Sequence, residues 1–468
     1  MSEAVLAPKF AGLRKKLFPP PPEHPLFSNL SLKKLIVPLV IEQILAITVG
    51  MADTMMVSSA GEAAVSGVSL VDMINVLLIN IFAALATGGA VVTSQFIGAQ
   101  DRKGACRSGM QLLLVSLGAS LLIMGLTLVF QSPLLQLLFG SITPEVMDNC
   151  LTYLWLSAIS YPFLALYNAC AALFRAMGNS KVSMYTSAFM NALNILGNAI
   201  CVMGLGMGVA GVALPSLISR GVAAGVMLVL LRNPSHLVTL RGQSFRPDFS
   251  MIRKILHVGI PNGLENGLFQ LGRVLVVSII SVFGTAQIAA NAVANNLDAL
   301  GCIPGQAMSL AVITVIGQCI GAQDYGQAAY YTKKLLKLSY LMGAVCNGLI
   351  LLLLPWLLAI YNISPEAQAL AFLLVWIHDG LAIFLWPAAF ILPNALRAAN
   401  DVRFTMAVSI FSMWAFRILL SYLIALGLQW GAVGVWLAMI VDWVFRIVLF
   451  VWRFASGRWK LHKSLASS

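Results

Sequence analysis

The heptapeptide QFIGAQD at Gln95–Asp101 occurs again, with one substitution, as QCIGAQD at Gln318–Asp324. The two copies are 223 residues apart in a chain of 468 residues, so the spacing is close to half the chain length. A duplicated segment at this spacing predicts two similar halves, and further matches test that idea.

Three further segments match in the same order along both halves. They are Pro38–Glu42 with Pro261–Glu265, Gly208–Val212 with Gly431–Val435 and, at a shift of 222 residues, Phe174–Lys181 with Leu396–Arg403. One such match can arise by chance, but four in one order indicate an internal repeat.

The composition places both halves in a membrane. Hydrophobic residues make up 59% of the chain and charged residues 10%, whereas a soluble domain has roughly 45–50% and about 25%. These values exclude a soluble enzyme, a disordered chain and a disulfide scaffold. The seven cysteines lack CxxC or CxxH spacing, so we expect buried thiols and no metal-binding framework. The net charge of +12 therefore reflects membrane topology, and no nucleic-acid partner is expected.

Apolar stretches of about 20 residues match a hydrocarbon core about 30 Å thick. Twelve such spans are predicted, at 35–57, 68–90, 109–130, 149–172, 183–204, 208–231, 255–281, 286–316, 335–360, 367–392, 404–427 and 431–452. Lys and Arg cluster in every second loop, and the opposite loops have none. By the positive-inside rule we expect both termini to lie in the cytoplasm. We expect the membrane to be the plasma membrane.

This pattern divides the chain into five parts. A cytoplasmic tail (1–34) precedes an amino-terminal lobe of six helices (35–231), a linker (232–254), a second six-helix lobe (255–453) and a tail (454–468). Both lobes start on the same side, so the repeat is parallel. We expect an all-α integral membrane protein with twelve transmembrane helices, whose lobes are related by a pseudo-two-fold axis along the membrane normal.

Ionisable side chains inside the predicted spans need an explanation, because each costs at least ~2.5–3.5 kcal/mol at mid-bilayer. The acids are Glu42, Asp53, Asp72, Glu265, Asp298, Asp379 and Asp442, and the cations are Arg220, Arg273, Arg417 and Arg446. The acids outnumber the arginines. Surplus buried acids either bind a cation or carry a proton, and both are working parts of an ion-coupled transporter.

Three of these acids are the primary candidates. Glu265 lies near the middle of the seventh span, just after Pro261, and Asp53 lies in the outer half of the first. Asp379 follows His378 in the tenth span. Glu42, Asp298, Arg273, Arg417 and Asp442 are secondary candidates, and the spacing of Asp442 and Arg446 predicts an intrahelical ion pair.

Amide side chains in the fifth span offer a second kind of ligand. Asn194 and Asn198 are four residues apart and share one helix face. Their oxygens could complete a Na⁺ site with Asp53, or the amides could bond neighbouring helices, as polar residues in spans commonly do. The spacing alone does not choose between the two.

These motifs together resemble the MATE (multidrug and toxic compound extrusion) family of the prokaryotic type. The similar segments are Met51–Val57, both QxxGA copies, Phe174–Asn179, Asn194–Asn198, Gly206–Ala213 and Gly259–Glu265. The resemblance implies a transporter that exports organic, often cationic or amphipathic, compounds in exchange for Na⁺ or H⁺ through alternating access. It implies no cofactor, and we expect a monomer.

The resemblance also assigns roles by position. Asp53 is expected to be the essential acid of the amino-terminal lobe, assisted by Asn194 and Ser216. Glu265, with Asp379, is expected to form the cation site of the other lobe. Many prokaryotic members carry Asp where this chain has Asn198, so a Na⁺ site there is weakened and the coupling ion is left open as H⁺ or Na⁺.

Three other functions are alternatives for such a sequence. A lipid or lipid-linked oligosaccharide flippase of the same superfamily is the main alternative. A major facilitator transporter is less favoured, because Gly98–Gly104 lacks the spacing of that family's loop. A membrane enzyme is not expected, since the sequence has no HExxH, nucleophile elbow or GxxxxGK phosphate loop.

Overall fold

A computed structural model describes residues 22–58, 61–140, 143–361 and 363–466. The predicted tail thus lies outside the described residues over 1–21, as do the final two positions of the predicted carboxy-terminal tail. Over the described residues the fold is all-helical, and it fits twelve membrane helices in two six-helix lobes. Eleven of the described helices are long and apolar enough to cross a membrane by length and composition.

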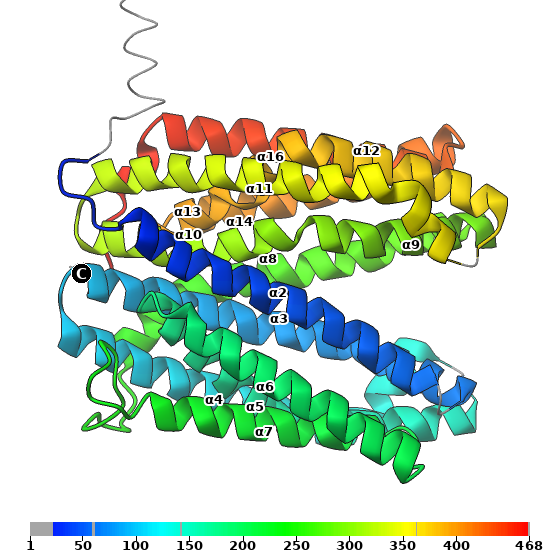
Figure 1. Cartoon of the computed structure of the whole chain (residues 1–468), viewed down its shortest axis with the longest axis horizontal. Coiled ribbons are helices and arrows are strands. Elements are labelled where there is room, and N and C mark those ends of the chain that lie inside the picture. The colour runs from blue at the N-terminus through cyan, green and yellow to red at the C-terminus, as the bar shows by residue number, and fades with distance from the viewer. Residues whose placement is uncertain (1–21, 59–60, 141–142, 362, 467–468) are drawn as a thin grey trace, which may run out of the picture. The chain divides into compact units, whose positions relative to one another are not determined.

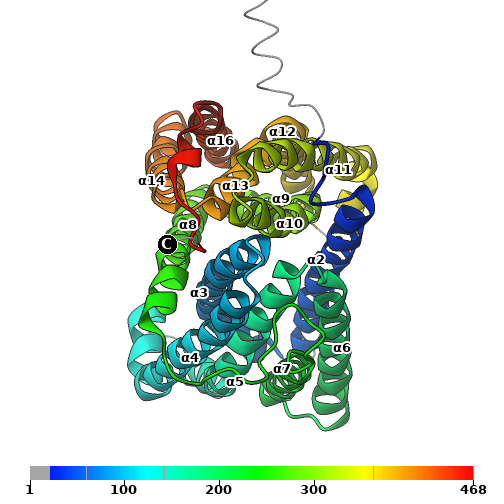
Figure 2. The ribbon, with the colours of Figure 1, turned by 90° about the vertical axis from the view of Figure 1, so that its left-hand side faces the viewer.

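The helices of the first half follow the predicted order (Figure 1). They are α2 (Asn29–Ser58), α3 (Glu62–Gly98), α4 (Arg102–Phe139), α5 (Pro144–Ala176), α6 (Ser180–Asn198), which continues into the π-helix η1 (Ala199–Gly204), and α7 (Ala210–Leu230). Within this half α4 and α5 pack along each other, and α7 packs against α5 and α6 (Figures 1 and 2).

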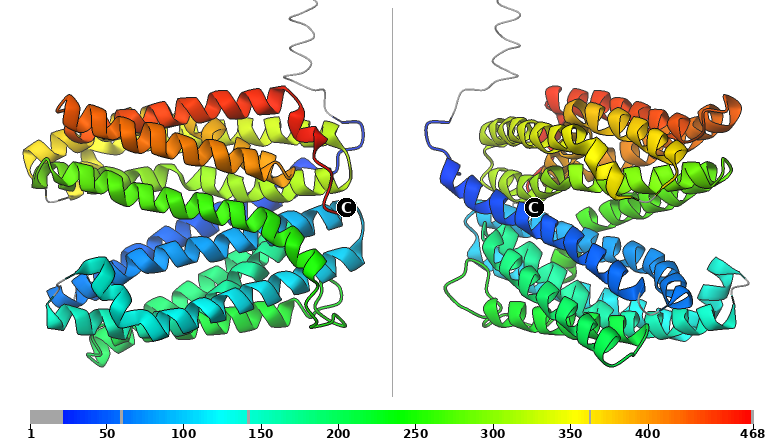
Figure 3. Two further views of the ribbon diagram at one scale, coloured as in Figure 1. Left: turned by 180° about the vertical axis from the view of Figure 1, so that it is seen from behind. Right: turned by 45° about the vertical axis from the view of Figure 1, so that its right-hand side comes forward.

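The second half repeats this order with more interruptions. It has α8 (Phe249–Ser281), α9 (Thr285–Gly301), α10 (Ile303–Gly321), α11 (Tyr325–Ile360), α12 (Pro365–Phe390), α13 (Leu392–Ala398), α14 (Val402–Ser412), η2 (Met413–Leu419), α15 (Leu420–Tyr422), η3 (Leu423–Gly427), α16 (Gly431–Ala455) and the short η4 (Arg458–Leu461). In Figure 3, α16 (red) lies beside the segment from α14 to η3 (orange), which it contacts.

The eighth predicted span, 286–316, differs from the structure because it is two helices. The chain breaks at Cys302, between α9 and α10. Pro304 lies in the first turn of α10 and has no N–H to donate to the preceding helix, so the break falls just before it.

The repeated heptapeptide forms the turn between two helices in each half. Gln100 and Gln323 adopt left-handed backbone conformations, with φ of 59° and 57°. Asp101 then caps α4 by accepting the N–H of Gly104 at 2.9 Å, and Asp324 caps α11 by accepting that of Gln327 at 2.8 Å. The motif is thus a helix stop followed by an N-cap.

The chain packs as two compact units. The amino-terminal unit comprises Lys34–Ile97 and Asp101–Gly267, and the carboxy-terminal unit comprises Leu268 onward, Gly98–Gln100 and the residues up to Lys33. The first residues of α8 therefore pack with the amino-terminal unit. The predicted lobe boundaries at 231 and 255 stay predictions.

Polar contacts hold the connecting segments within each unit. In the amino-terminal unit Asp248 caps α8 by accepting the N–H groups of Ser250 and Met251, and it pairs with Arg107. Desolvation acts to raise the pKa of Asp248, but the Met251 N–H and the Arg107 guanidinium outweigh it and lower the pKa overall. In the carboxy-terminal unit the backbone of Phe27 exchanges hydrogen bonds with the Tyr331 hydroxyl.

Gly88 lies where α3 packs closely against α8, and a larger residue there would test this contact. A Cβ atom there would lie 2.6 Å from the Ile255 carbonyl oxygen and 2.8 Å from the Gly259 nitrogen, both rigid backbone atoms. We expect Gly88→Ala to destabilise the protein by about 1–3 kcal/mol, measured as a lower thermal unfolding midpoint in detergent. Gly125→Ala, which meets nothing within 4 Å, is the control and should be neutral or stabilising. Equal midpoints for the two variants would contradict the close contact.

Candidate functional site

Asp53 on α2 is one end of a chain of hydrogen-bonded side chains that crosses three helices of the amino-terminal unit. The Asn198 Nδ2 donates to Asp53 Oδ1 at 2.7 Å and lies 3.2 Å from Asn194 Oδ1. The Asn194 Nδ2 donates in turn to the Ser216 Oγ on α7 at 2.8 Å. The structure therefore brings together all four residues that the sequence placed in this site.

Asn198 is the residue of this chain that contacts the carboxylate of Asp53 directly. Asn198 is fully buried, and its Oδ1 has no hydrogen-bond partner among the described residues. Amide nitrogen and oxygen positions are assigned from such networks. A rotated Asn198 would present that oxygen to Asp53, where it can accept a hydroxyl proton from a neutral carboxyl or contact a small cation.

A second cluster of polar side chains lies on α3 and α5. The sequence did not predict that these residues come together. Asp72 Oδ1 accepts hydrogen bonds from the Tyr153 hydroxyl and the Asn75 Nδ2, both at 3.1 Å. The Tyr161 hydroxyl donates to Asn75 Oδ1 at 2.9 Å. Asp72 and Asn75 are three residues apart on one helix, and this spacing was the available signal. Arg220, on α7, acts electrostatically on both Asp53 and Asp72.

Glu42 is a buried acid whose two carboxylate oxygens both contact side chains of neighbouring helices. Its Oε1 lies 3.5 Å from Arg175 Nη1, and its Oε2 accepts the Ser183 hydroxyl at 2.8 Å. These contacts join α2 to α5 and α6. A buried carboxylate with both oxygens engaged in this way pairs helices and needs no transported ligand to satisfy it.

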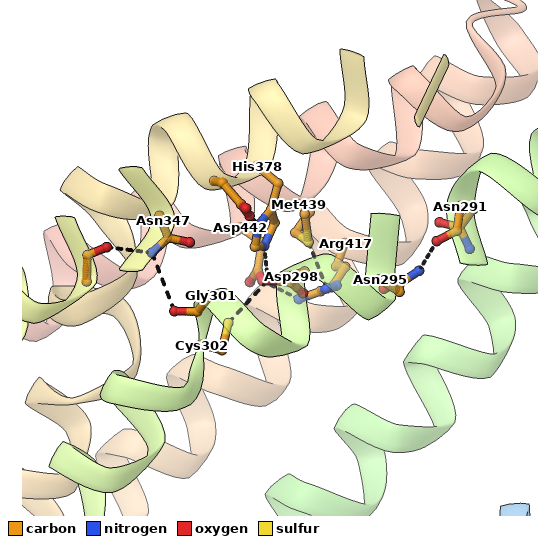
Figure 4. Close-up of polar contacts among 12 residues, drawn as sticks. Asn291, Asn295, Asp298, Gly301, Cys302, Asn347, His378, Arg417, Met439 and Asp442 are labelled. Carbon is orange, nitrogen blue, oxygen red and sulfur yellow. Dashed lines mark hydrogen bonds and ion pairs between the residues drawn. The ribbon is translucent and has the colours of Figure 1, made fainter. Parts of the chain in front are cut away.

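His378 joins two of the predicted acids in the carboxy-terminal unit, and Figure 4 shows it beside one of them, Asp298. Its Nε2 lies 2.9 Å from Asp298 Oδ1 on α9, and its Nδ1 lies 2.8 Å from Asp379 Oδ1. His378 and Asp379 are almost fully buried. One ligand atom from each of the three residues lies within 4.8 Å of the others, so the group has the spacing to hold a small cation.

Aromatic and thiol groups surround this histidine. The rings of Trp436 and Trp443 on α16 approach His378 edge-on, with centroids 5.3 and 4.9 Å away. The Cys302 Sγ lies 3.2 Å from Asp298 Oδ1, and this thiol is at the break between α9 and α10. The Asp298–His378 contact was missed because it joins helices far apart in the sequence.

Asp442 is the centre of an ion-pair group with two arginines. Its Oδ1 accepts the Arg446 Nε at 2.9 Å, as the four-residue spacing predicts, and its Oδ2 lies 3.7 Å from Arg417 Nη1. Asp442 is fully buried. Arg417 also lies 5.0 Å from the centre of the Phe269 ring. Two cations neutralising one acid indicate a structural role.

Two residues predicted to share a site, Glu265 and Asp379, belong to different compact units. Glu265 is buried on α8 and packs with the amino-terminal unit, whereas Asp379 belongs to the carboxy-terminal unit. The structure therefore does not test their pairing. Arg273 lines a small cavity of about 60 Å³ together with Asp298 and Arg417.

Comparisons with known proteins agree on one family. A sequence model described as MatE matches residues 38–200 and 261–423. The chain is 29% identical to "Uncharacterized transporter YisQ" of Bacillus subtilis, over 95% of this chain and 98% of that protein. It is 26% identical to "Probable multidrug resistance protein NorM" of Thermotoga maritima, over 91% and 92%.

A solved structure matches in fold. It is described as the outward-facing conformation of a multidrug resistance MATE family transporter of the MOP superfamily, and it aligns with a TM-score of 0.86 at 20% identity. The alignment covers 94% of this chain and 96% of that one. This likeness concerns the fold alone.

The ion-pair group of Asp442 gives a stability prediction. Asp442→Asn should cost about 3–5 kcal/mol, because it leaves Arg446 buried without its counter-charge. Removing that charge as well, in Asp442→Asn with Arg446→Met, should recover part of the loss. Thermal unfolding in detergent measures both, with Asp148→Asn at an exposed position as the control. A double variant no more stable than the single one would contradict the pairing.

Proposed function

Since the chain belongs to the MatE family, we propose that it is a secondary active multidrug transporter. It exports organic compounds, cationic or amphipathic in character, in exchange for H⁺ or Na⁺. The names of several relatives support this substrate class, because they are described as probable multidrug resistance proteins.

The Asp53 chain is the observation that carries the proposal. A half-buried carboxylate inside a membrane is costly unless a ligand or proton neutralises it. Here its recorded hydrogen-bond donor is one amide, from Asn198. Because that amide also has an unpaired oxygen, it can serve the charged and the neutral carboxyl in turn. Asp53 can therefore keep a hydrogen bond to Asn198 in both its charged and its neutral form.

The geometry favours H⁺ at this position. A Na⁺ ion in protein prefers several oxygen ligands, including carboxylates. Asp53 is the one carboxylate of the chain that runs through Asn198 and Asn194 to Ser216. A proton needs one carboxylate and one acceptor, and both are present.

The His378 group is the proposed counterpart in the carboxy-terminal lobe. Both imidazole nitrogens face carboxylate oxygens, and an imidazole donates from both nitrogens only when it carries the extra proton. This arrangement favours a stored proton. Glu265 remains a further candidate for the same lobe on the basis of the family resemblance.

Coupling then follows from competition. We propose that the substrate binds when the coupling carboxylates are charged and leaves when H⁺ or Na⁺ neutralises them. By thermodynamic linkage, each ligand lowers the affinity of the other by the same factor. Alternating access exposes the sites to one side of the membrane at a time. We further propose that both termini face the cytoplasm, because the Lys- and Arg-rich loops share their side.

Asp53→Asn is the first test. We expect it to keep the fold but to lose ion-driven transport, by roughly tenfold or more given typical coupling factors. Purified protein in liposomes with an entrapped fluorescent lipophilic cation measures this, with a pH gradient and a Na⁺ gradient imposed separately. Glu366→Gln, at an exposed acid outside the network, is the matched control.

Two outcomes of that assay would count against the proposal. Wild-type rates in Asp53→Asn would remove Asp53 from the coupling mechanism. A wild-type protein that moves the dye under neither gradient would instead favour the flippase alternative.

Asn198→Asp tests which ion is used. The substitution adds a second carboxylate at the position whose amide nitrogen now lies 2.7 Å from Asp53, and paired carboxylates suit a hard cation. We expect wild-type export to follow the pH gradient and the variant to gain a response to the Na⁺ gradient. If wild-type export already follows Na⁺ and the variant adds nothing, the assignment of H⁺ is wrong.

A further inference from the structure

A cavity of about 580 Å³ lies in the carboxy-terminal unit, where α11 begins and α16 ends. Its walls include Lys333 and Leu336 of α11, Val451 and Phe454 of α16, and Trp459 of η4. Figure 2 shows the carboxy-terminal segment (red) near α13 and α16 at this end. The volume is within the usual range for small-ligand sites, about 300–1,000 Å³.

The charges on this cavity have one sign. Lys333 and Lys460 are its charged lining residues, and among the described residues that line it there is no Asp or Glu. The two ammonium groups are near enough to repel each other. A bound anion would relieve this repulsion, whereas a cationic export substrate would add to it.

The other walls are apolar and aromatic. Leu336, Val451 and Phe454 form an apolar surface beside the lysines. The Trp459 ring stacks on Phe454, with centroids 5.3 Å apart and planes 2° from parallel. Tryptophan next to lysine is typical of the boundary between hydrocarbon and water. The cavity therefore suits a ligand with an anionic head and an apolar tail.

The wall made by η4 is held in place by its own contacts. The Trp459 Nε1 donates to the Phe454 carbonyl at 3.0 Å. After η4, the Asn400 Nδ2 donates to the Lys463 carbonyl at 2.8 Å, and the Tyr325 hydroxyl donates to the His462 carbonyl at 3.4 Å. One wall of the cavity is thus a fixed part of the fold.

The internal repeat provides a comparison within the same chain. At the shift of 223 residues, Met110 occupies the position of Lys333 and Gly109 that of Thr332. In the first half the chain after α7 fills this place, because fully buried Val238 packs against Gly109, and Cys106 contacts the Leu237 carbonyl. In the second half the equivalent place borders the cavity among the described residues, and Lys333 lies there.

We propose that this cavity binds an anionic phospholipid from the leaflet beside the Lys- and Arg-rich loops. Lys333 and Lys460 hold the phosphate, and one acyl chain lies along Leu336, Val451 and Phe454. Basic pockets between membrane helices on the cytoplasmic side are suited to such headgroups. The site is separate from the proposed coupling residues and adds a lipid-binding function to the carboxy-terminal lobe.

Native mass spectrometry of the full chain in detergent tests the proposal. The probes are dioleoyl phosphatidylglycerol, dioleoyl phosphatidylcholine and inorganic phosphate. We expect one tightly bound phosphatidylglycerol, little phosphatidylcholine, and no displacement of the lipid by millimolar phosphate. The variant Lys333→Gln with Lys460→Gln should weaken phosphatidylglycerol binding by roughly tenfold to thirtyfold, as two lost phosphate contacts imply.

Two further variants distinguish the cavity from general charge attraction. Lys337→Gln with Lys463→Gln removes two exposed charges outside the cavity lining and should leave the affinity unchanged. Ala329→Phe fills the cavity, which Ala329 lines, while keeping both lysines, and should abolish tight binding. Gel filtration and thermal unfolding confirm that each variant is folded.

Several results would overturn the proposal. They are equal binding of the two lipids, equal losses in the two lysine pairs, or unchanged affinity in Ala329→Phe. Full displacement by inorganic phosphate would show instead that the cavity takes a free anion. All of these readouts measure binding, so they are independent of whether the chain exports drugs.

Discussion

Hydrocarbon offers no hydrogen-bond partner, so every backbone polar group that enters the membrane must be satisfied within the protein, and a polar side chain left unpaired there is costly. The backbone meets this requirement by being helical, and the side chains meet it by forming chains from helix to helix. Asp53 reaches Ser216 through two asparagines, Asp298 reaches Asp379 through His378, and Asp442 is held between two arginines. Polar residues within the spans therefore lie next to one another, where they can form hydrogen bonds and ion pairs.

The same constraint explains how much could be predicted from sequence. Helix order could be predicted from apolar stretches and charge asymmetry, because both are properties of consecutive residues in the sequence. The repeat followed from the heptapeptide, whose last Gln adopts a left-handed turn and whose Asp caps the next helix in both copies. The contact of Asn194 with Asn198 followed from helical spacing. In each case the signal is local.

Contacts between distant helices could not be predicted in this way. The pairing of Asp298 with His378 depends on how α9 and α12 pack, and α9 ends at a break that hydropathy does not reveal. The sequence grouped Glu265 with Asp379 through family resemblance, and the structure gives these residues to different units. The two halves keep the same helices but differ in chemistry. The amino-terminal half bonds Asp53 to an amide and Asp72 to an amide and a tyrosine, whereas the carboxy-terminal half balances three acids against histidine and arginine.

The anchored segment after α16 has a practical consequence for membrane topology experiments. Reporter proteins are often fused to successive truncations of a membrane protein to find which side each loop faces. A fusion joined directly after Ala455 would delete η4 and with it the contacts of Trp459, His462 and Lys463 with the helices. A fusion joined after Ala466 would keep them. The second position should therefore report the side of the membrane on which the native segment after α16 lies. The first would report on a chain that lacks η4, which is one wall of the cavity.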